Sequence, residues 1–278
     1  MEGHEIVALV AGEGMPEFSK MHPKGMRERI RAGEWTSPTA GLCDGYVQTN
    51  VVILPSVFAY DFLLFCQRNP KPCPLIEVTD VGSVEPRITA PGADLRTDLP
   101  KYRIYRRGRV EGEVPDLKGI WREDLVSFLL GCSFTFEAAL QKVGVPVRHI
   151  EEGKNVPMYV TNRSCKEAGI FAGPLVVSMR PLPAHLIPLA VGVTSRFPLA
   201  HGAPVHVGDP ENLGIKNLEQ PEFGDPVTIH PGEVPVFWAC GVTPQAVAMH
   251  VKPELMITHA PGHMFITDLT DDHLTLLA

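Results

Sequence analysis

The stretch 46-YVQTNVVILPSVFAYDFLLFCQRNPKPCPLIEVTDVG-82 contains the pattern on which the fold prediction rests. Residues 46–55 are rich in β-branched side chains and stop at a proline, which predicts a buried strand. Apolar residues then recur at helical spacing over 55–69, with a proline where a helix N-terminus tolerates one. Because the segment 74–82 returns to strand character, the stretch predicts a βαβ unit.

A second strand–helix–strand pattern lies near the C-terminus. The segment VPVFWAC (234–240) predicts a strand, and TPQAVAMHV (243–251) predicts a helix that is capped by Thr243 and has Pro244 at its first position. ELMITH (254–259) predicts another strand. Two such units indicate a partly parallel sheet, because consecutive strands joined through a helix normally run parallel.

The middle of the chain has a different character and predicts a separate unit. We expect a discontinuous α/β domain formed by residues 1–145 together with 231–278, whose sheet is mixed and partly parallel. Residues 146–230 are expected to form an inserted, smaller α+β two-layer domain. The elements expected in the middle of the chain are helices at 121–131, 134–144 and 184–197, and strands at 147–152, 157–162, 175–181 and 204–208.

Composition narrows the function classes. The chain has 278 residues, of which 44% are hydrophobic and 21% charged, and no apolar run approaches the ~20 residues of a membrane span. We therefore expect a soluble protein without a membrane partner, and the acidic flanks of its first apolar patch favour a cytoplasmic location. The net charge of −7 argues against nucleic acid as a partner, since phosphate binding needs a basic surface. The basic run 101–109 predicts a hairpin around Arg107-Gly108.

Cys240 stands at the end of the predicted strand 234–240, directly before a helix N-terminus. The helix dipole and its free amides favour a thiolate or a bound anion at such a place, whereas the alternative is a structural cysteine in a tight turn. Ligands of open α/β sheets bind at the carboxyl ends of the strands. His259 ends the next strand, so we expect it to face the same crevice as Cys240.

His259 and His263 stand four positions apart, with Pro261-Gly262 between them. Proline and glycine predict a bend here, which excludes the helical zinc-binding pattern H-E-x-x-H. Both histidines are candidates for acid/base chemistry. In the alternative, the imidazoles only tie the turn to backbone carbonyl groups.

Two further segments carry polar side chains that suit an anionic substrate. The run 147–158 contains Arg148, Glu151 and Asn155, although exposed ion pairs on a solvated edge would give the same pattern. Arg180 and Arg196 have the planar guanidinium that clamps a carboxylate through two hydrogen bonds. The segment 193–210 is dense in glycine and proline, and its polar residues are Ser195, Arg196, His201, His206 and Asp209. His201, His206 and Asp209 are metal-ligand types, but their spacing matches no metal motif.

Ten segments, taken together, resemble a known family. They are GYVQTNVVILP, DFLLFCQRNPKPCPLIEVTDVG, DLRTDLPKYRIY, LLGCSFTFE, VRHIEEGKNVPMY, GPLVVSMRP, TSRFP, HGAPVHVGDP, VPVFWACGVTPQ and ELMITHAPGHMF, in this order. In these segments the chain resembles the YcsI-like family, also called the D-glutamate cyclase family of hydro-lyases. The resemblance extends over nearly the whole chain after about Arg31.

The resemblance implies a carbon–oxygen lyase of 5-oxoproline metabolism that closes D-glutamate to 5-oxo-D-proline with loss of water. Arg148 or Arg196 would then hold the α-carboxylate, and His259 or His263 would move protons. Amides after Cys240 would stabilise the oxyanion, unless the Cys240 thiol itself attacks to form a thioester. The remaining contacts to the substrate are expected from Glu151, Asn155, Arg180, Ser195, His201 and Thr243.

Two other functions stay open at the level of sequence. One is a metal-dependent hydro-lyase that acts on another small carboxylic acid, with a divalent ion held by His201, His206, Asp209 and the histidines His259 and His263. The other is a non-catalytic module that binds amino acids or 5-oxoproline. In each case the partner is a small molecule, no further cofactor is implied, and assembly into a homo-oligomer is left open.

Overall fold

The computed structural model describes residues 18–275. The strands are β1 (Tyr46–Pro55), β2 (Leu75–Val78), β3 (Tyr102–Arg106), β4 (Arg109–Val114), β5 (Leu125–Gly131), β6 (Met158–Ser164), β7 (Pro174–Pro183), β8 (His206–Val207), β9 (Glu233–Ala239), β10 (Met256–His259) and β11 (Phe265–Thr270). The α-helices are α2 (Pro23–Arg31), α3 (Ala59–Arg68), α4 (Phe134–Lys142), α5 (Arg148–Glu151), α6 (Ile187–Ser195) and α7 (Thr243–Val251). Short 3-10 turns are η1 (Ser56–Phe58), η2 (Ala184–Leu186), η3 (Pro198–Ala200), η4 (Pro210–Leu213) and η5 (Asp271–Leu274).

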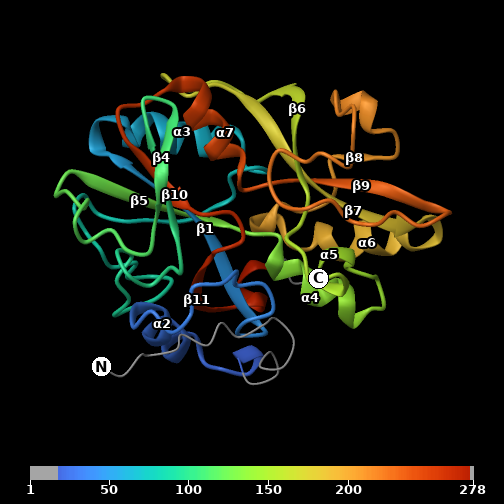
Figure 1. The fold of residues 1–278 in the computed structure, drawn as a ribbon, viewed down its shortest axis with the longest axis horizontal. Coiled ribbons are helices and arrows are strands. Elements are labelled where there is room, and N and C mark those ends of the chain that lie inside the picture. The colour runs from blue at the N-terminus through green and yellow to red at the C-terminus, as the bar shows by residue number, and fades with distance from the viewer. Residues whose placement is uncertain (1–17, 276–278) are drawn as a thin grey trace, which may run out of the picture.

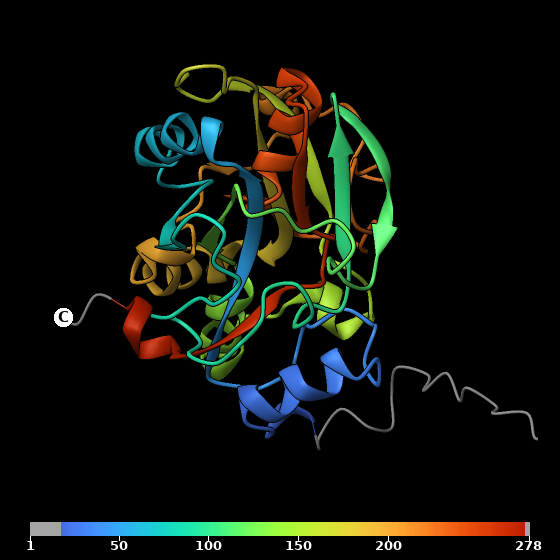
Figure 2. The same cartoon turned by 90° about the vertical axis from the view of Figure 1, so that its left-hand side faces the viewer.

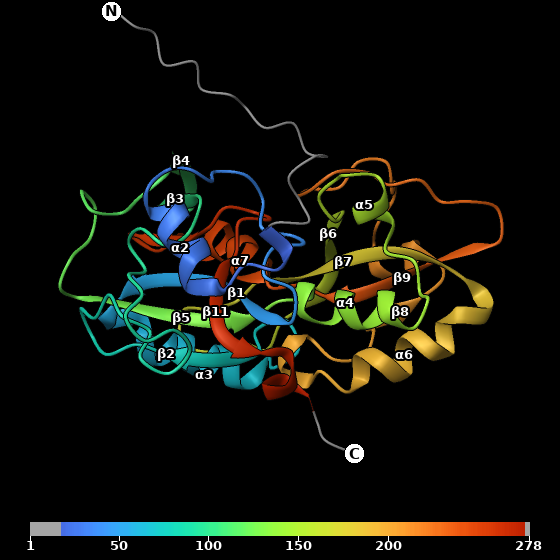
Figure 3. The same cartoon turned by 90° about the horizontal axis from the view of Figure 1, so that it is seen from below.

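Two β-sheets lie side by side in the described part of the chain (Figure 1). The larger sheet has the strand order β2-β5-β1-β10-β3-β4, and β11 also pairs with β1. The smaller sheet has the order β6-β7-β9-β8. Helices α3 and α6 lie on the same side of the two sheets (Figure 3), whereas the β3–β4 hairpin, green in Figure 2, lies away from α3. No helix within residues 18–275 is long and apolar enough to cross a membrane.

The predicted partly parallel sheet is wrong, because every strand pair in residues 18–275 is antiparallel. Both strand–helix–strand patterns exist, but neither joins two neighbouring strands of one sheet. Strand β5 lies between β1 and β2, and it is antiparallel to both. Helix α7 leads from β9 in the smaller sheet to β10 in the larger one. The first pattern thus joins two parallel strands with an antiparallel strand between them, and the second joins the two sheets, so neither gives adjacent parallel strands.

Strand β1 is the predicted strand 46–55, and it forms the centre of the larger sheet. Val52 and Leu54 point into a core under α3 and α7, while Val51 and Ile53 point into a second core on the opposite face. Both faces of the strand are thus buried, which explains its unbroken run of apolar and β-branched residues. This strand bonds to β5 along its length and to β10 and β11 on its other edge.

Two predicted elements have the wrong type. The segment 121–131 was expected to be helical, but its apolar part is strand β5, which is buried along its whole length. A short apolar run that is buried on both faces has no periodicity to distinguish strand from helix. The segment 147–152 was expected to be a strand, but it contains the single-turn helix α5. The helices expected at 134–144, 184–197 and 243–251 are confirmed as α4, α6 and α7.

The domain division stays a prediction, and the sheets depart from it at one point. Strand β9 was expected in the α/β domain, but it pairs with β7 and β8 in the smaller sheet. The chain thus leaves the larger sheet after β5 and returns to it through α7. The predicted hairpin is confirmed: Arg107 and Gly108 both have positive φ angles, 49° and 76°, as a two-residue turn of this kind requires.

At the end of β5, the backbone of η3 lies unusually close to the backbone of Gly131. A β-carbon on Gly131 would lie 1.6 Å from the carbonyl oxygen of Leu199 in η3. The backbone cannot move away easily, because Gly131 pairs with Thr49 and its amide also donates to Pro74 O. Only glycine therefore fits at this place.

We predict that Gly131→Ala lowers the free energy of unfolding by about 3 kcal/mol or more, because a buried backbone must shift to admit the methyl group. Gly112→Ala in β4 is the matched control, since nothing lies within 4 Å of the place that its β-carbon would take. This control should change stability by less than about 1 kcal/mol. Urea denaturation of both variants measures the difference. Equal stability of the two variants would contradict the close packing at Gly131.

Candidate functional site

A buried ion pair between Arg180 of β7 and Glu137 of α4 lies at the centre of the candidate site. The two side chains are 0% and 3% exposed. Arg180 Nε donates to Glu137 Oε1 at 3.1 Å, and Nη2 donates to the same oxygen. The other guanidinium hydrogen bonds go to Ser133 Oγ at 3.0 Å and Ser178 Oγ at 3.1 Å. The donors of Arg180 are thus engaged inside the protein.

The surroundings of this ion pair favour its charged state. The Arg180 guanidinium lies 5.3 Å from the ring centre of Phe136 and 5.4 Å from that of Trp238. His149 Nε2 lies 3.3 Å from Glu137 Oε1. Burial by itself raises the pKa of Glu137, but the charges of His149 and Arg180 and their hydrogen bonds outweigh it and hold the pKa at about 2. Glu137 is therefore a buried carboxylate that stays ionised.

Cys240 lies where it was predicted, at the end of β9 and before α7. Burial raises the pKa of its thiol to about 11, and the Val242 amide offsets only part of this increase. The thiol is thus protonated near neutral pH, and the expected thiolate is not favoured. The helix dipole acts at this position, but desolvation has the larger effect.

The turn around Cys240 is held by tight contacts on both sides. A β-carbon on Gly241 would lie 2.0 Å from Asn50 Nδ2, and Asn50 Nδ2 donates to Gly131 O at 2.7 Å. Thr243 Oγ1 donates to Cys240 O at 2.7 Å and accepts from Val176 N at 3.1 Å. The prediction of Thr243 as the helix N-cap is wrong, because Val242 occupies that position and Thr243 braces the turn.

His259 ends β10, as predicted, and is 1% exposed. Its Nδ1 lies 3.2 Å from the amide nitrogen of Val51 and 3.4 Å from the carbonyl oxygen of the same residue, so either tautomer of the ring has a partner there. Nε2 is buried and has no hydrogen-bond partner within residues 18–275. Burial lowers the pKa of His259 to about 4, which keeps the ring neutral. The result is a neutral imidazole whose Nε2 is unpaired.

His263 follows the predicted bend, and Gly262 has the positive φ of 81° that this bend requires. Its Nδ1 lies 3.0 Å from the Pro261 carbonyl oxygen, which can only accept, so Nδ1 carries the proton and Nε2 carries the lone pair. Burial lowers the pKa of His263. Asn155 lies against the same turn, because its Nδ2 is 3.0 Å from where a Gly262 β-carbon would be.

The predicted cluster around Arg148 is an ion-pair network. Arg148 Nε donates to Glu151 Oε2 at 3.0 Å, and Nη2 donates to Glu233 Oε1 at 2.5 Å. Ser195 and Arg196 are exposed at the end of α6. The Arg196 guanidinium makes no ion pair within residues 18–275, whereas those of Arg148 and Arg180 are bound to carboxylates.

The three predicted metal ligands do not converge. His201 is buried with Nδ1 2.7 Å from Lys71 O, and burial lowers its pKa to about 4. His206 Nε2 instead lies 2.7 Å from the backbone oxygen of Asp209. In the described part of the chain, no group of three or more His, Cys, Asp or Glu side chains is arranged to hold a metal ion.

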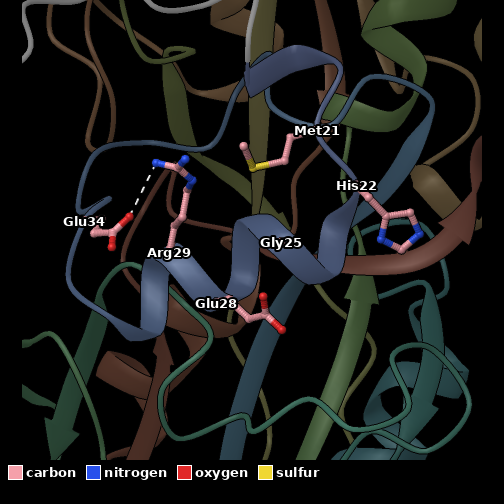
Figure 4. A pocket seen from close by; sticks show the side chains of 6 residues that line it. All are labelled: Met21, His22, Gly25, Glu28, Arg29 and Glu34. Carbon is pink, nitrogen blue, oxygen red and sulfur yellow. Dashed lines mark hydrogen bonds and ion pairs between the residues drawn. The ribbon is translucent and has the colours of Figure 1, made fainter.

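A surface hollow of about 360 Å³ lies along α2, away from these residues (Figure 4). Its lining includes His22, Glu28 and Arg29, and Arg29 already pairs with Glu34 at 3.4 Å. None of the predicted site residues lines it. The hollow therefore offers no link to the buried charges.

Sequence reasoning missed the two partners of Arg180 that define the cluster, Glu137 and Ser133. Both stand in the segment LLGCSFTFE, which contributed to the family resemblance. A second signal was the placement of a glutamate beside Phe136 in a helix whose neighbouring residues are apolar. Asn50 was missed although it lies in a buried strand next to Gln48 and Thr49, where a buried amide normally marks a specific contact.

The comparisons with known proteins agree with the resemblance. A protein of Stutzerimonas stutzeri (strain A1501), named "Putative hydro-lyase", is 64% identical over 260 residues, which cover 94% of this chain and 98% of that protein. Relatives from Thermoanaerobacter sp. (strain X514) and Geobacillus kaustophilus (strain HTA426) carry the same description. They are 64% and 63% identical over 94% and 92% of this chain, and over 99% and 98% of their own lengths.

Among solved structures, a nitrogen repressor-like protein from Methanococcus jannaschii gives a TM-score of 0.35 at 10% identity, covering 88% of this chain and 97% of its own. At this score the likeness does not define a shared fold. The family model described as D-glutamate cyclase matches residues 126–268. Since this match covers half of the chain and the hydro-lyase relatives cover nearly all of it, the chain belongs to the D-glutamate cyclase family.

Proposed function

We propose that this protein closes D-glutamate to 5-oxo-D-proline with loss of water. The observation that carries the proposal is the family match over residues 126–268. This segment includes the buried pair Glu137 and Arg180, the Cys240 turn, and both histidines of the bend. The residues with site-like chemistry and the family match thus lie in the same part of the chain.

The stoichiometry of the reaction defines what the site must do. The α-nitrogen forms a bond to the γ-carbon, and one γ-oxygen leaves as water. Both protons of that water come from the substrate ammonium group, so the net reaction neither releases nor consumes a proton. One group that accepts a proton from nitrogen and returns it to oxygen is therefore sufficient, together with a donor that stabilises the oxyanion.

The two histidines suit these separate tasks. His263 has its lone pair on Nε2 and a lowered pKa, so it is a neutral base that can accept a proton from the substrate nitrogen. His259 has an unpaired Nε2, and in the tautomer whose Nδ1 accepts from the Val51 amide it is a neutral donor for the γ-carboxyl oxygen. In this assignment the bend places a base and a donor four residues apart.

The remaining roles fall on the Cys240 turn and an arginine. The amide of Gly241 donates to no backbone carbonyl within residues 18–275 and supplies a further oxyanion donor, whereas the Val242 amide is hydrogen-bonded to the Cys240 thiol. A protonated Cys240 thiol makes direct thioester formation the less favoured route. Arg196 is the predicted arginine that stays free of an ion pair, so it is assigned to the α-carboxylate, while Arg180 positions Glu137.

We predict that the purified protein converts D-glutamate to 5-oxo-D-proline and acts much more slowly on L-glutamate. Chiral chromatography with mass detection measures both products, before and after treatment with a chelator. Unchanged turnover after chelation is expected, because the proposed steps use protein groups alone. Turnover that returns only with added divalent metal would favour the metal-dependent hydro-lyase. Binding of D-glutamate without turnover would favour the non-catalytic module.

We further predict that His259→Asn lowers kcat by about two orders of magnitude, because asparagine keeps an acceptor for the Val51 amide but removes the Nε2 donor. His263→Ala should lower kcat by a similar factor through loss of the base. Steady-state rates measure both effects, and circular dichroism and elemental analysis check folding and bound metal.

The control for these variants is His250→Ala, which removes an exposed histidine of α7 and should keep the full rate. If His259→Asn and His263→Ala also turn over at the full rate, the two rings only support the backbone. Loss of a stoichiometric metal together with activity would instead identify them as ligands.

A further inference from the structure

A small cavity of about 50 Å³ lies on the side of α4 that faces the start of β1. It is bounded by the turn before β1, by the first residues of β1, by α4 and by the first residue of η5. The polar side chains that line it include Gln48, Glu137, Gln141 and Asp271. It therefore borders the buried carboxylate of the candidate site without being part of the surface hollow on α2.

Gln48 gives the clearest sign that this cavity has a specific occupant. Its side chain is buried, with a residue exposure of 4%. Its Nε2 donates to Thr39 O at 2.9 Å and to Leu42 O at 3.2 Å, and these two carbonyl groups fix the orientation of the amide. Its Oε1 is buried and accepts no hydrogen bond from residues 18–275. Because an unpaired buried acceptor is unfavourable, a hydrogen-bond donor belongs beside it.

The other polar walls of the cavity also present acceptors. Asp271 Oδ1 is buried and has no hydrogen-bond partner within residues 18–275. Glu137 is ionised and is paired with Arg180. Burial raises the pKa of Asp271 to about 6, and the charge of Lys142 offsets only part of this increase, so Asp271 is mostly ionised at neutral pH. An occupant that donates several hydrogen bonds and carries positive charge fits these walls.

The size of the cavity limits the occupant further. A volume of about 50 Å³ holds one or two groups of the size of water or ammonium, and it is too small for a whole amino acid. Within residues 18–275 no group of three or more His, Cys, Asp or Glu side chains is arranged to hold a metal ion, so the cavity walls do not form a metal site of that kind. Size, charge and hydrogen bonding thus favour a single nitrogen that carries several N–H bonds.

We propose that this cavity binds an ammonium group, with Gln48 Oε1, Asp271 Oδ1 and the Glu137 carboxylate as its acceptors. Two kinds of ligand carry such a group. One is a free ammonium ion, and the other is an amino acid whose amino group reaches in from the candidate site. This assignment goes beyond the proposed function, because it concerns a binding site whose occupancy can be measured in the absence of turnover.

The test uses the full-length protein and 15N-labelled ammonium chloride. An ammonium ion held in a buried site exchanges its protons slowly, so proton NMR filtered through 15N should show a signal distinct from that of free ammonium. Potassium chloride is the competing ion, because potassium carries one positive charge but has no N–H donors. We expect a bound signal that potassium displaces only weakly. No bound signal in the wild-type protein would overturn the proposal and leave the cavity to water.

Variants connect the signal to the cavity. Asp271→Asn removes the charge and keeps the shape, and it should weaken ammonium binding about 10- to 100-fold. Asp272→Asn is the matched control, because its exposed neighbouring carboxylate does not line the cavity. Gln48→Met, which removes the amide acceptor, is the second variant and should also weaken binding. Equal affinities in the wild type and all three variants would place the bound ion elsewhere and overturn the proposal.

Addition of D-glutamate distinguishes the two sources of the ammonium group. Displacement of the labelled ammonium by D-glutamate, with no displacement by glutarate, identifies the amino group of the substrate as the natural occupant. Retention of the label beside bound D-glutamate identifies free ammonium as the occupant. Failure of the proposed cyclisation leaves both results readable, since neither measurement depends on product formation.

Discussion

The buried ion pair between Arg180 and Glu137 is the constraint on which the rest of the structure depends. A single charge taken out of water is strongly unfavourable, so each partner must find the other and satisfy its remaining hydrogen bonds. Arg180 belongs to the smaller sheet, while Glu137 belongs to α4, which packs on β1 of the larger sheet. The pair therefore fixes how α4 sits between the sheets, and Ser133 and Ser178 complete its hydrogen bonding.

This constraint also determines what the neighbouring groups can do. The negative charge of Glu137 is held by Arg180 and His149, so it persists at neutral pH even though the carboxylate is buried. Cys240 and His259 have no such partner, and burial keeps both of them neutral. The interior thus contains one stabilised carboxylate among neutral donors and acceptors. Such an arrangement suits chemistry in which protons move between the substrate's own groups.

Much of the fold could be predicted because the elements follow from local pattern. Strand β1 and helices α4, α6 and α7 lie where β-branched runs or helical periodicity placed them. The topology could not be predicted in the same way. Strand β5 (Leu125–Gly131) inserts between β1 and β2 although both precede it and β2 already ends at Val78, and no local signal specifies that pairing. Helix α5 was missed because a single turn is too short to show a helical period.

The parts of the site that follow from backbone geometry could be predicted from the sequence. The properties that depend on burial could not. Pro261-Gly262 predicted the bend, and the positive φ of Gly262 confirms it. The position of Cys240 before a helix was also correct, but its desolvation is not visible in the sequence. Glu137 was missed because its partner Arg180 lies 43 positions away, so the local pattern around this helix does not identify the pairing.

The two histidines have different backbone neighbours. His259 Nδ1 contacts both the amide nitrogen and the carbonyl oxygen of Val51 in β1, at 3.2 Å and 3.4 Å, whereas His263 Nδ1 lies 3.0 Å from the Pro261 carbonyl oxygen of the bend. Burial lowers the pKa of both rings, so neither gains a second proton near neutral pH. The hydrogen-bond partners of the two rings are therefore set by β1 and by the Pro-Gly bend. Because β1 is also the central strand of the larger sheet, the hydrogen bonding of the candidate site depends on the same strand that organises the fold.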